Sequence, residues 1–113
     1  MKIEVRLRGL ESFQIVRDHA ARRVLFHLSR FGKEVTLVLV RISDINGPKG
    51  GIDTRCQVTV RGPRFGSTTL HDLSGDAYSA IDMAVERIGR QVGREIDRVR
   101  NTKRVGPSLR SAS

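Results

Sequence analysis

The sequence is poor in cysteine, in aromatic residues and in long apolar runs. A single cysteine, Cys56, excludes a disulfide within the chain. Tryptophan is absent and aromatic residues make up only 4% of the chain, so we expect an aliphatic core. No apolar stretch approaches the ~20 residues that span a membrane. The N-terminus alternates charged and apolar residues and lacks the apolar run of a signal peptide. We therefore expect a cytoplasmic protein with no membrane partner.

What the chain has in excess is positive charge. Its 113 residues fit one domain, in which a sheet is covered by one helical layer. Lysine and arginine number 21 against 12 acidic residues, which gives a formal net charge of +9. The sequence pI is about 11.2. Such a balance is typical of nucleic-acid binding, although an anionic membrane, an acidic protein partner or a merely solubilising surface would also fit. Most of the cations are arginine, whose planar fork pairs with phosphate oxygens, and this favours RNA.

Hydrophobic periodicity predicts six elements in the order β-α-β-β-β-α. Apolar residues alternate in residues 2–8 and 54–61 and recur at three- and four-residue steps in the predicted helices. Residues 34–43 are apolar on both faces at their centre, which predicts a central strand partly covered on both sides. The strands span residues 2–8, 34–43, 54–61 and 65–71, and the helices span residues 12–31 and 75–100. This order predicts an α+β two-layer sandwich, in which a four-stranded sheet carries two helices on one face. The first helix is expected to cross over between two parallel strands. Residues 1–100 form the domain, and residues 101–113 are predicted to be a disordered basic tail.

The first helix is predicted to begin at Ser12 as its N-cap and to stop at Gly32. Its outer side carries basic residues but also Ile15 and Phe26, which a simple amphipathic helix does not explain. Asp76 is expected to cap the second helix.

A row of arginines on the second helix is the strongest functional signal. At about 100° per residue, its apolar residues fall within an arc of roughly 80°, and a set of arginines falls almost opposite. These are Arg87, Arg90, Arg94 and Arg98. One reading is a solvated face balanced by ion pairs, since Glu86 can pair with Arg90 and Asp97 lies near the row. We favour the other reading, in which the row is little neutralised and follows a phosphate backbone.

Other basic residues extend this hypothesis. If both helices lie on one face of the sheet, Arg22, Arg23 and Arg30 of the first helix would form one continuous basic surface with the row. Lys49, in the Gly- and Pro-rich loop 44–53, could contact RNA as well. The open face of the sheet would hold further arginines, which serve either as a second contact or as solubilising charge. They are Arg6, Arg8, Arg55 and Arg61.

Signals for an enzyme are weak. The three histidines show no metal-ligand spacing with Cys56, which falls at an inward strand position and is expected to be a core thiol. No group of residues fits the requirements of a catalytic site, so we expect no catalytic residue, metal, cofactor or small-molecule substrate. Gly89 and Gly93 lie inside the second helix, where they either loosen it or allow close packing.

The sequence also resembles a known family. The stretches NGPKGGIDTRCQVTV (46–60) and AYSAIDMAVERIGRQVGREIDRVR (77–100) are similar to those of ribosome hibernation-promoting factors, also called ribosome-associated inhibitors, and the likeness covers roughly residues 1–100. The resemblance implies binding to rRNA of the small (30S) ribosomal subunit in the channel of mRNA and tRNA. Translation would be blocked and idle ribosomes stabilised under stress. Arg23 and the arginine row match basic positions on the family's two helices. The chain looks like the short type, which lacks the dimerisation domain, and we expect a monomer off the ribosome.

Two alternatives remain open beside this ribosome-binding hypothesis. One is a general binder of double-stranded or structured RNA. The other is an adaptor for an acidic protein partner such as a sigma factor, since the family has also been linked to modulating one.

Overall fold

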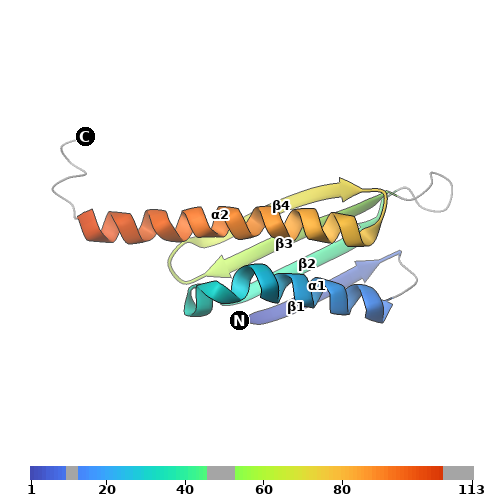
Figure 1. Ribbon diagram of the computed structural model, residues 1–113, viewed down its shortest axis with the longest axis horizontal. Coiled ribbons are helices and arrows are strands. Elements are labelled where there is room, and N and C mark those ends of the chain that lie inside the picture. The colour runs from blue at the N-terminus through green and yellow to red at the C-terminus, as the bar shows by residue number, and fades with distance from the viewer. Residues whose placement is uncertain (10–12, 46–52, 106–113) are drawn as a thin grey trace.

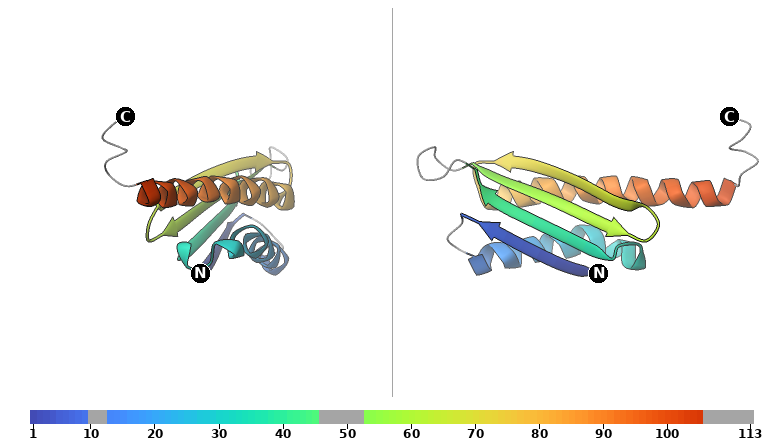
Figure 2. Two further views of the ribbon diagram at one scale, coloured as in Figure 1. Left: turned by 60° about the vertical axis from the view of Figure 1, so that its left-hand side comes forward. Right: turned by 180° about the vertical axis from the view of Figure 1, so that it is seen from behind.

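The computed structural model describes residues 1–9, 13–45 and 53–105 and forms a four-stranded sheet with two helices on one face (Figure 1). The elements are β1 (Lys2–Arg8), α1 (Phe13–Leu28), the 3-10 helix η1 (Ser29–Glu34), β2 (Leu37–Asp44), β3 (Thr54–Gly62), β4 (Gly66–Ser74) and α2 (Ala77–Val105). The strand order is β1-β2-β3-β4, in which β1 and β2 are parallel and the other two pairs are antiparallel. Seen from behind, the sheet lies in front of both helices (Figure 2). The predicted α+β fold is therefore confirmed.

Several predicted boundaries were wrong. The first helix ends at Leu28 and continues as the 3-10 helix η1, inside which Gly32 adopts a φ of 56°. Gly32 thus provides a left-handed kink within η1 and is not the stop of the α-helix. Helix α2 extends to Val105, so the first residues assigned to the tail are helical. Three predictions fall outside the described residues. They are the N-cap at Ser12, the RNA contact at Lys49 and the disordered tail over residues 106–113.

The core is aliphatic, as expected, and lies between the sheet and the two helices. Alternate residues of the central strands, such as Val40 and Val58, are fully buried against it. The helices contribute the other half of the core. Their buried residues include Val16, Ala20, Val24 and Leu28 of α1 and Ile81, Val85, Ile88, Val92 and Ile96 of α2. Burying each large aliphatic side chain stabilises the fold by about 1.5–3 kcal/mol, so these buried residues hold both helices on the sheet.

The two helices run side by side in the same direction (Figure 1) and approach closely at glycine. A Cβ atom at Gly89 would lie 3.3 Å from the Cβ of His27 and 3.6 Å from its carbonyl oxygen. A Cβ at Gly93 would lie 3.5 Å from the Phe31 ring. Of the two roles left open for these glycines, the structure supports close helix packing.

Candidate nucleic-acid interface

The arginines of α2 face solvent because an N-cap fixes the start of the helix and the core fixes its apolar side. Asp76 precedes the first turn and accepts hydrogen bonds from the backbone N–H and the hydroxyl of Ser79, both at 2.9 Å. These bonds lower the pKa of the Asp76 carboxyl, as expected for an N-cap. The predicted cap is confirmed. With the apolar side of α2 buried, helical geometry turns the row of Arg87, Arg90, Arg94 and Arg98 toward solvent over about 16 Å.

The row is more neutralised than the sequence suggested. Three of its arginines have carboxylate partners and the fourth has an amide partner. The pairs are Arg87–Asp72 (2.8 Å), Arg90–Glu86 (3.3 Å), Arg98–Glu95 (3.2 Å) and Arg94–Gln91 (3.0 Å). Our expectation of little neutralisation was therefore wrong. Only the Glu86 pair was foreseen, because Asp72 comes from β4 and Glu95 lies at the margin of the helix face.

These ion pairs leave the arginines available to an anion. The side chains of Arg87, Arg90 and Arg98 are 47%, 61% and 68% exposed. Exposed ion pairs contribute only about 0–1 kcal/mol, so a phosphate can displace the carboxylate at small cost. A hollow of about 340 Å³ lies between α2 and β4 and is lined by Leu70, Arg87, Arg90, Gln91 and Arg94. Three arginines of the row therefore converge on one concave site.

On α1, the two predicted contact residues behave differently. Arg22 is exposed and forms no ion pair with any described residue. Arg23 is half-buried and lies between the helices, where its NH2 group donates to Nε2 of His27 at 2.9 Å. Its Nε lies 3.3 Å from Oδ1 of Asp82, too poorly aligned for a hydrogen bond, so this contact is electrostatic. Arg23 thus joins α1 to α2 and is less available to a ligand than Arg22.

Other groups around Asp82 complete this link between the helices. His19 donates from Nε2 to Oδ1 of Asp82 at 2.7 Å, and its ring meets the Tyr78 ring edge-on at 5.0 Å. Burial and the charge of Arg23 lower the pKa of His27, which favours the neutral ring, and a neutral ring can accept from Arg23 at Nε2. We call His19, Arg23, His27 and Asp82 the interhelix network.

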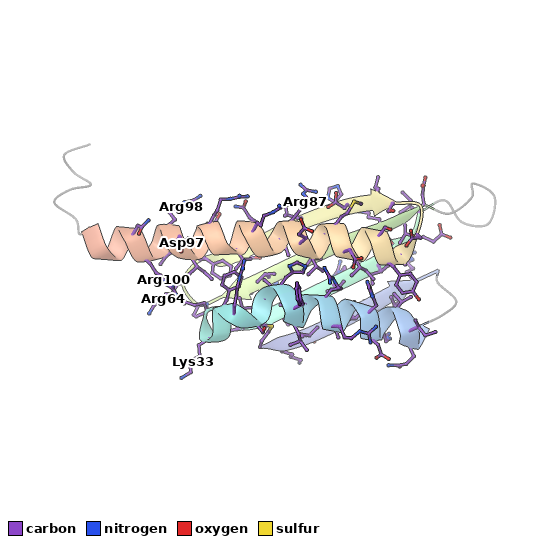
Figure 3. All side chains as sticks on the ribbon, viewed as in Figure 1. Lys33, Arg64, Arg87, Asp97, Arg98 and Arg100 are labelled. Atoms are coloured by element: carbon purple, nitrogen blue, oxygen red, sulfur yellow. The ribbon has the colours of Figure 1, made fainter. Side chains whose placement is uncertain are left out.

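The predicted continuous basic surface across both helices depends on which side of α2 the arginine row occupies. The arginine row lies on the side of α2 that faces β4, where Arg87 also donates to the carbonyl of His71. Figure 3 shows Arg87 and Arg98 on the side of α2 away from α1. The side of α2 that faces α1 instead carries Asp82 and the two close-packed glycines. A surface that joins the row to Arg22, Arg23 and Arg30 therefore stays a prediction.

Two residues were missed or left unexplained by the sequence. Phe26 is 72% exposed, with the Arg23 guanidinium 5.1 Å from its ring centroid, so an aromatic surface does lie beside the α1 arginines. Arg41 on the open face of the sheet was overlooked. Side chains alternate along a strand, so Leu39, Arg41 and Ser43 share one face of β2, and the sequence could have placed Arg41 there.

The remaining groups of interest are Cys56 and the residue types that ligate metals. Cys56 is buried, and burial together with nearby Asp72 raises the pKa of its thiol to about 12, which confirms a core thiol. Within residues 1–9, 13–45 and 53–105, no group of three or more His, Cys, Asp or Glu side chains could hold a metal ion. No helix in the described part of the chain is long and apolar enough to cross a membrane.

Comparisons with known proteins agree on one family and one fold. A family model described as "Sigma 54 modulation protein / S30EA ribosomal protein" matches residues 3–100. The N-terminal domain of Thermus thermophilus Protein Y is 25% identical with a TM-score of 0.68, covering 83% of this chain and 98% of that one. A ribosomal subunit interface protein from Coxiella burnetii shares the fold at 13% identity with a TM-score of 0.69, covering 83% and 96%. No curated protein sequence matches the chain significantly.

Proposed function

Because the chain belongs to the Sigma 54 modulation protein / S30EA ribosomal protein family, we propose that it is a non-catalytic protein that binds rRNA of the small ribosomal subunit. The family resemblance noted from the sequence is confirmed by the match over residues 3–100. We further propose that binding occupies the mRNA and tRNA channel, blocks translation sterically and stabilises idle ribosomes under stress. This function places the protein in the cytoplasm.

The observation that carries this proposal is the concave arginine site between α2 and β4. Arg87, Arg90 and Arg94 line one hollow together with Leu70. Guanidinium groups bind phosphate oxygens in pairs, and a helix row spaced over about 16 Å can follow several phosphates. Arg94 donates to the Gln91 amide oxygen and forms no ion pair with any described residue, so a phosphate that binds Arg94 displaces no carboxylate there.

The α1 residues play separate roles in this proposal. Arg22 is an exposed cation that contacts a phosphate directly, whereas Arg23 holds α1 against α2 through Asp82. Phe26 offers its exposed ring for stacking on an unpaired base beside Arg22. Lys49 lies outside the described residues and stays a predicted contact.

Paired variants test the arginine site. Arg90→Gln with Arg94→Gln removes two charges from the hollow. The control, Arg64→Gln with Arg100→Gln, removes the same charge from side chains that both pair with Glu34, at 3.9 and 3.2 Å. Filter binding to purified small subunits should show at least about tenfold weaker binding for the first pair than for the control. Equal affinities for the two pairs would refute the assignment of the site.

The family description also names sigma 54 modulation, and a general RNA binder stays open. Each alternative has a distinct signature. A general RNA binder would bind naked RNA duplexes as tightly as subunits in a gel shift. An adaptor for an acidic protein would keep its partner after ribonuclease treatment.

A further inference from the structure

The face of the sheet opposite the helices is a second basic surface. No helix covers it in the described part of the chain, as the view from behind shows (Figure 2). Alternate residues of each strand point toward this face, because side chains alternate across a strand. The strand register then places side chains of neighbouring strands directly beside one another. One such row is Arg6, Arg41, Gln57 and His71, and the next is Arg8, Ser43, Arg55 and Leu73.

This register gathers like charges. Arg6 pairs with Arg41 across the parallel strands β1 and β2. Arg8 and Arg55 flank Ser43 in the adjacent row. Like charges directly opposite each other on neighbouring strands destabilise a sheet, so folding alone gives no reason for this arrangement.

Little negative charge offsets the cluster. Within strands β1 to β4, the one acidic side chain on the open face is Glu4, which lies 3.4 Å from Lys2 and 3.7 Å from Arg6. Arg55 donates to the neutral amide oxygen of Gln57 at 3.3 Å and forms no ion pair with any described residue. Arg8 and Arg41 are exposed and form no ion pair with any described residue. The α2 row, by contrast, has a carboxylate for three of its four arginines.

The cluster also has a concave shape. A groove of about 450 Å³ is lined by Arg6, Arg8, Arg41 and Arg55, with Gln57 and Ser43 between them and Leu7 and Ile42 below. It is larger than the hollow between α2 and β4, which measures about 340 Å³. We define these four arginines and their surroundings as the sheet groove.

We propose that the sheet groove binds the phosphate backbone of a second RNA segment, distinct from the one on the α2 row. The inference rests on the proposed function for its choice of RNA. Arginine forks that converge on one groove fit phosphate oxygens, which take two parallel N–H bonds. The groove crosses β1, β2 and β3 on the face of the sheet, so a ligand in it lies over the strands and does not add to the free edge of β1 as a further strand. Main-chain pairing, which gives a peptide its affinity for a sheet edge, is not used there, and this favours RNA phosphate over an acidic peptide.

The geometry separates the two RNA segments. The sheet groove is built from β1, β2 and β3 on the open face, whereas the α2 row lies behind β4 on the helical face. An RNA backbone bound at one site cannot reach the other site without turning around the edge of the sheet. The domain would consequently lie between two RNA segments and hold them at a fixed separation.

Two neutral substitutions test the groove by salt dependence. Arg41→Gln with Arg55→Gln removes two like charges, so the melting temperature should stay the same or rise. For binding to small subunits, the slope of log affinity against log salt should fall by about 1.4 to 1.8, because each phosphate contact contributes roughly 0.7–0.9. The Arg64→Gln, Arg100→Gln pair is the control with the same charge loss, and its slope should stay near the wild-type value. An unchanged slope in the groove variant, with wild-type binding intact, would overturn the inference and leave the proposed function standing.

A photochemical cross-link identifies what occupies the groove. A benzophenone side chain replaces Gln57, which lines the groove, and in a second sample it replaces Gln91 beside the α2 row. After irradiation with small subunits, both positions should cross-link to RNA, and sequencing should map them to different segments. Protein cross-linked from position 57 alone would overturn the inference in favour of an acidic partner. An absence of cross-links from 57 with RNA linked from 91 would overturn only the groove. An absence from both would overturn the proposed function as well.

Discussion

Replacing Asp82 by alanine should separate the two helices more than any other single surface change on α2. Oδ1 of Asp82 accepts from His19 at 2.7 Å and lies 3.3 Å from Nε of Arg23. The His19 and Arg23 side chains are only 20% and 32% exposed, so both would lose a charged partner in a partly dry setting. Hydrogen bonds to charged groups contribute about 1.5–3 kcal/mol, and discounting for solvent gives about 1–2 kcal/mol.

The assay is urea and thermal denaturation, with Asp97→Ala as the matched control. Asp97 is an exposed aspartate on the same helix and forms no ion pair with any described residue. Its removal should change stability by less than about 0.5 kcal/mol. For a domain of this size, Asp82→Ala should lower the melting temperature by about 5–10 °C. If the two variants have the same melting temperature, the interhelix network does not hold α1 in place and the assigned role of Arg23 in joining the helices is wrong.

Three further predictions concern single positions. Gly62→Ala should destabilise the fold by more than about 2 kcal/mol in urea denaturation, because an added Cβ would overlap the Glu34 carbonyl oxygen and the Phe65 ring; a neutral effect would contradict this packing. Asp76→Ala should cost about 1 kcal/mol at pH 7. Because the folded pKa of Asp76 is depressed below 3.8, that cost should vanish as the pH falls through the folded pKa, and a difference in melting temperature that persisted in strong acid would argue against the cap. Cys56, with a thiol pKa raised to about 12, should resist Ellman's reagent at pH 8 until the protein is unfolded, and rapid reaction of the native protein would contradict its burial.

The strands and the core were predictable because they follow local periodicity. The alternation of residues 54–61 assigned Cys56, Val58 and Val60 to the interior, and all three are fully buried. The end of α2 was missed because residues 101–105 continue the helix without an apolar period to mark it. Arginine and lysine sustain a helix well, and the first glycine after Asn101 is Gly106.

The electrostatics of the site could not be predicted in the same way. Which carboxylate reaches Arg87 depends on the register of β4, since Asp72 lies opposite Cys56 on the neighbouring strand. Likewise, the direction of the arginine row depends on how α2 is rotated against α1, which the contact at Gly89 sets. The sequence placed the arginines on one side of the helix, but only the tertiary contacts showed that this side faces β4.

We expect this domain to bind the small ribosomal subunit where mRNA and tRNA bind. The most direct measurement is co-sedimentation of the purified protein with separated 30S and 50S subunits at about physiological salt, followed by a challenge of the 30S complex with mRNA and tRNA. We expect binding to 30S alone and release by those competitors. Failure to sediment with either subunit, or binding to 30S that mRNA and tRNA leave untouched, would contradict it.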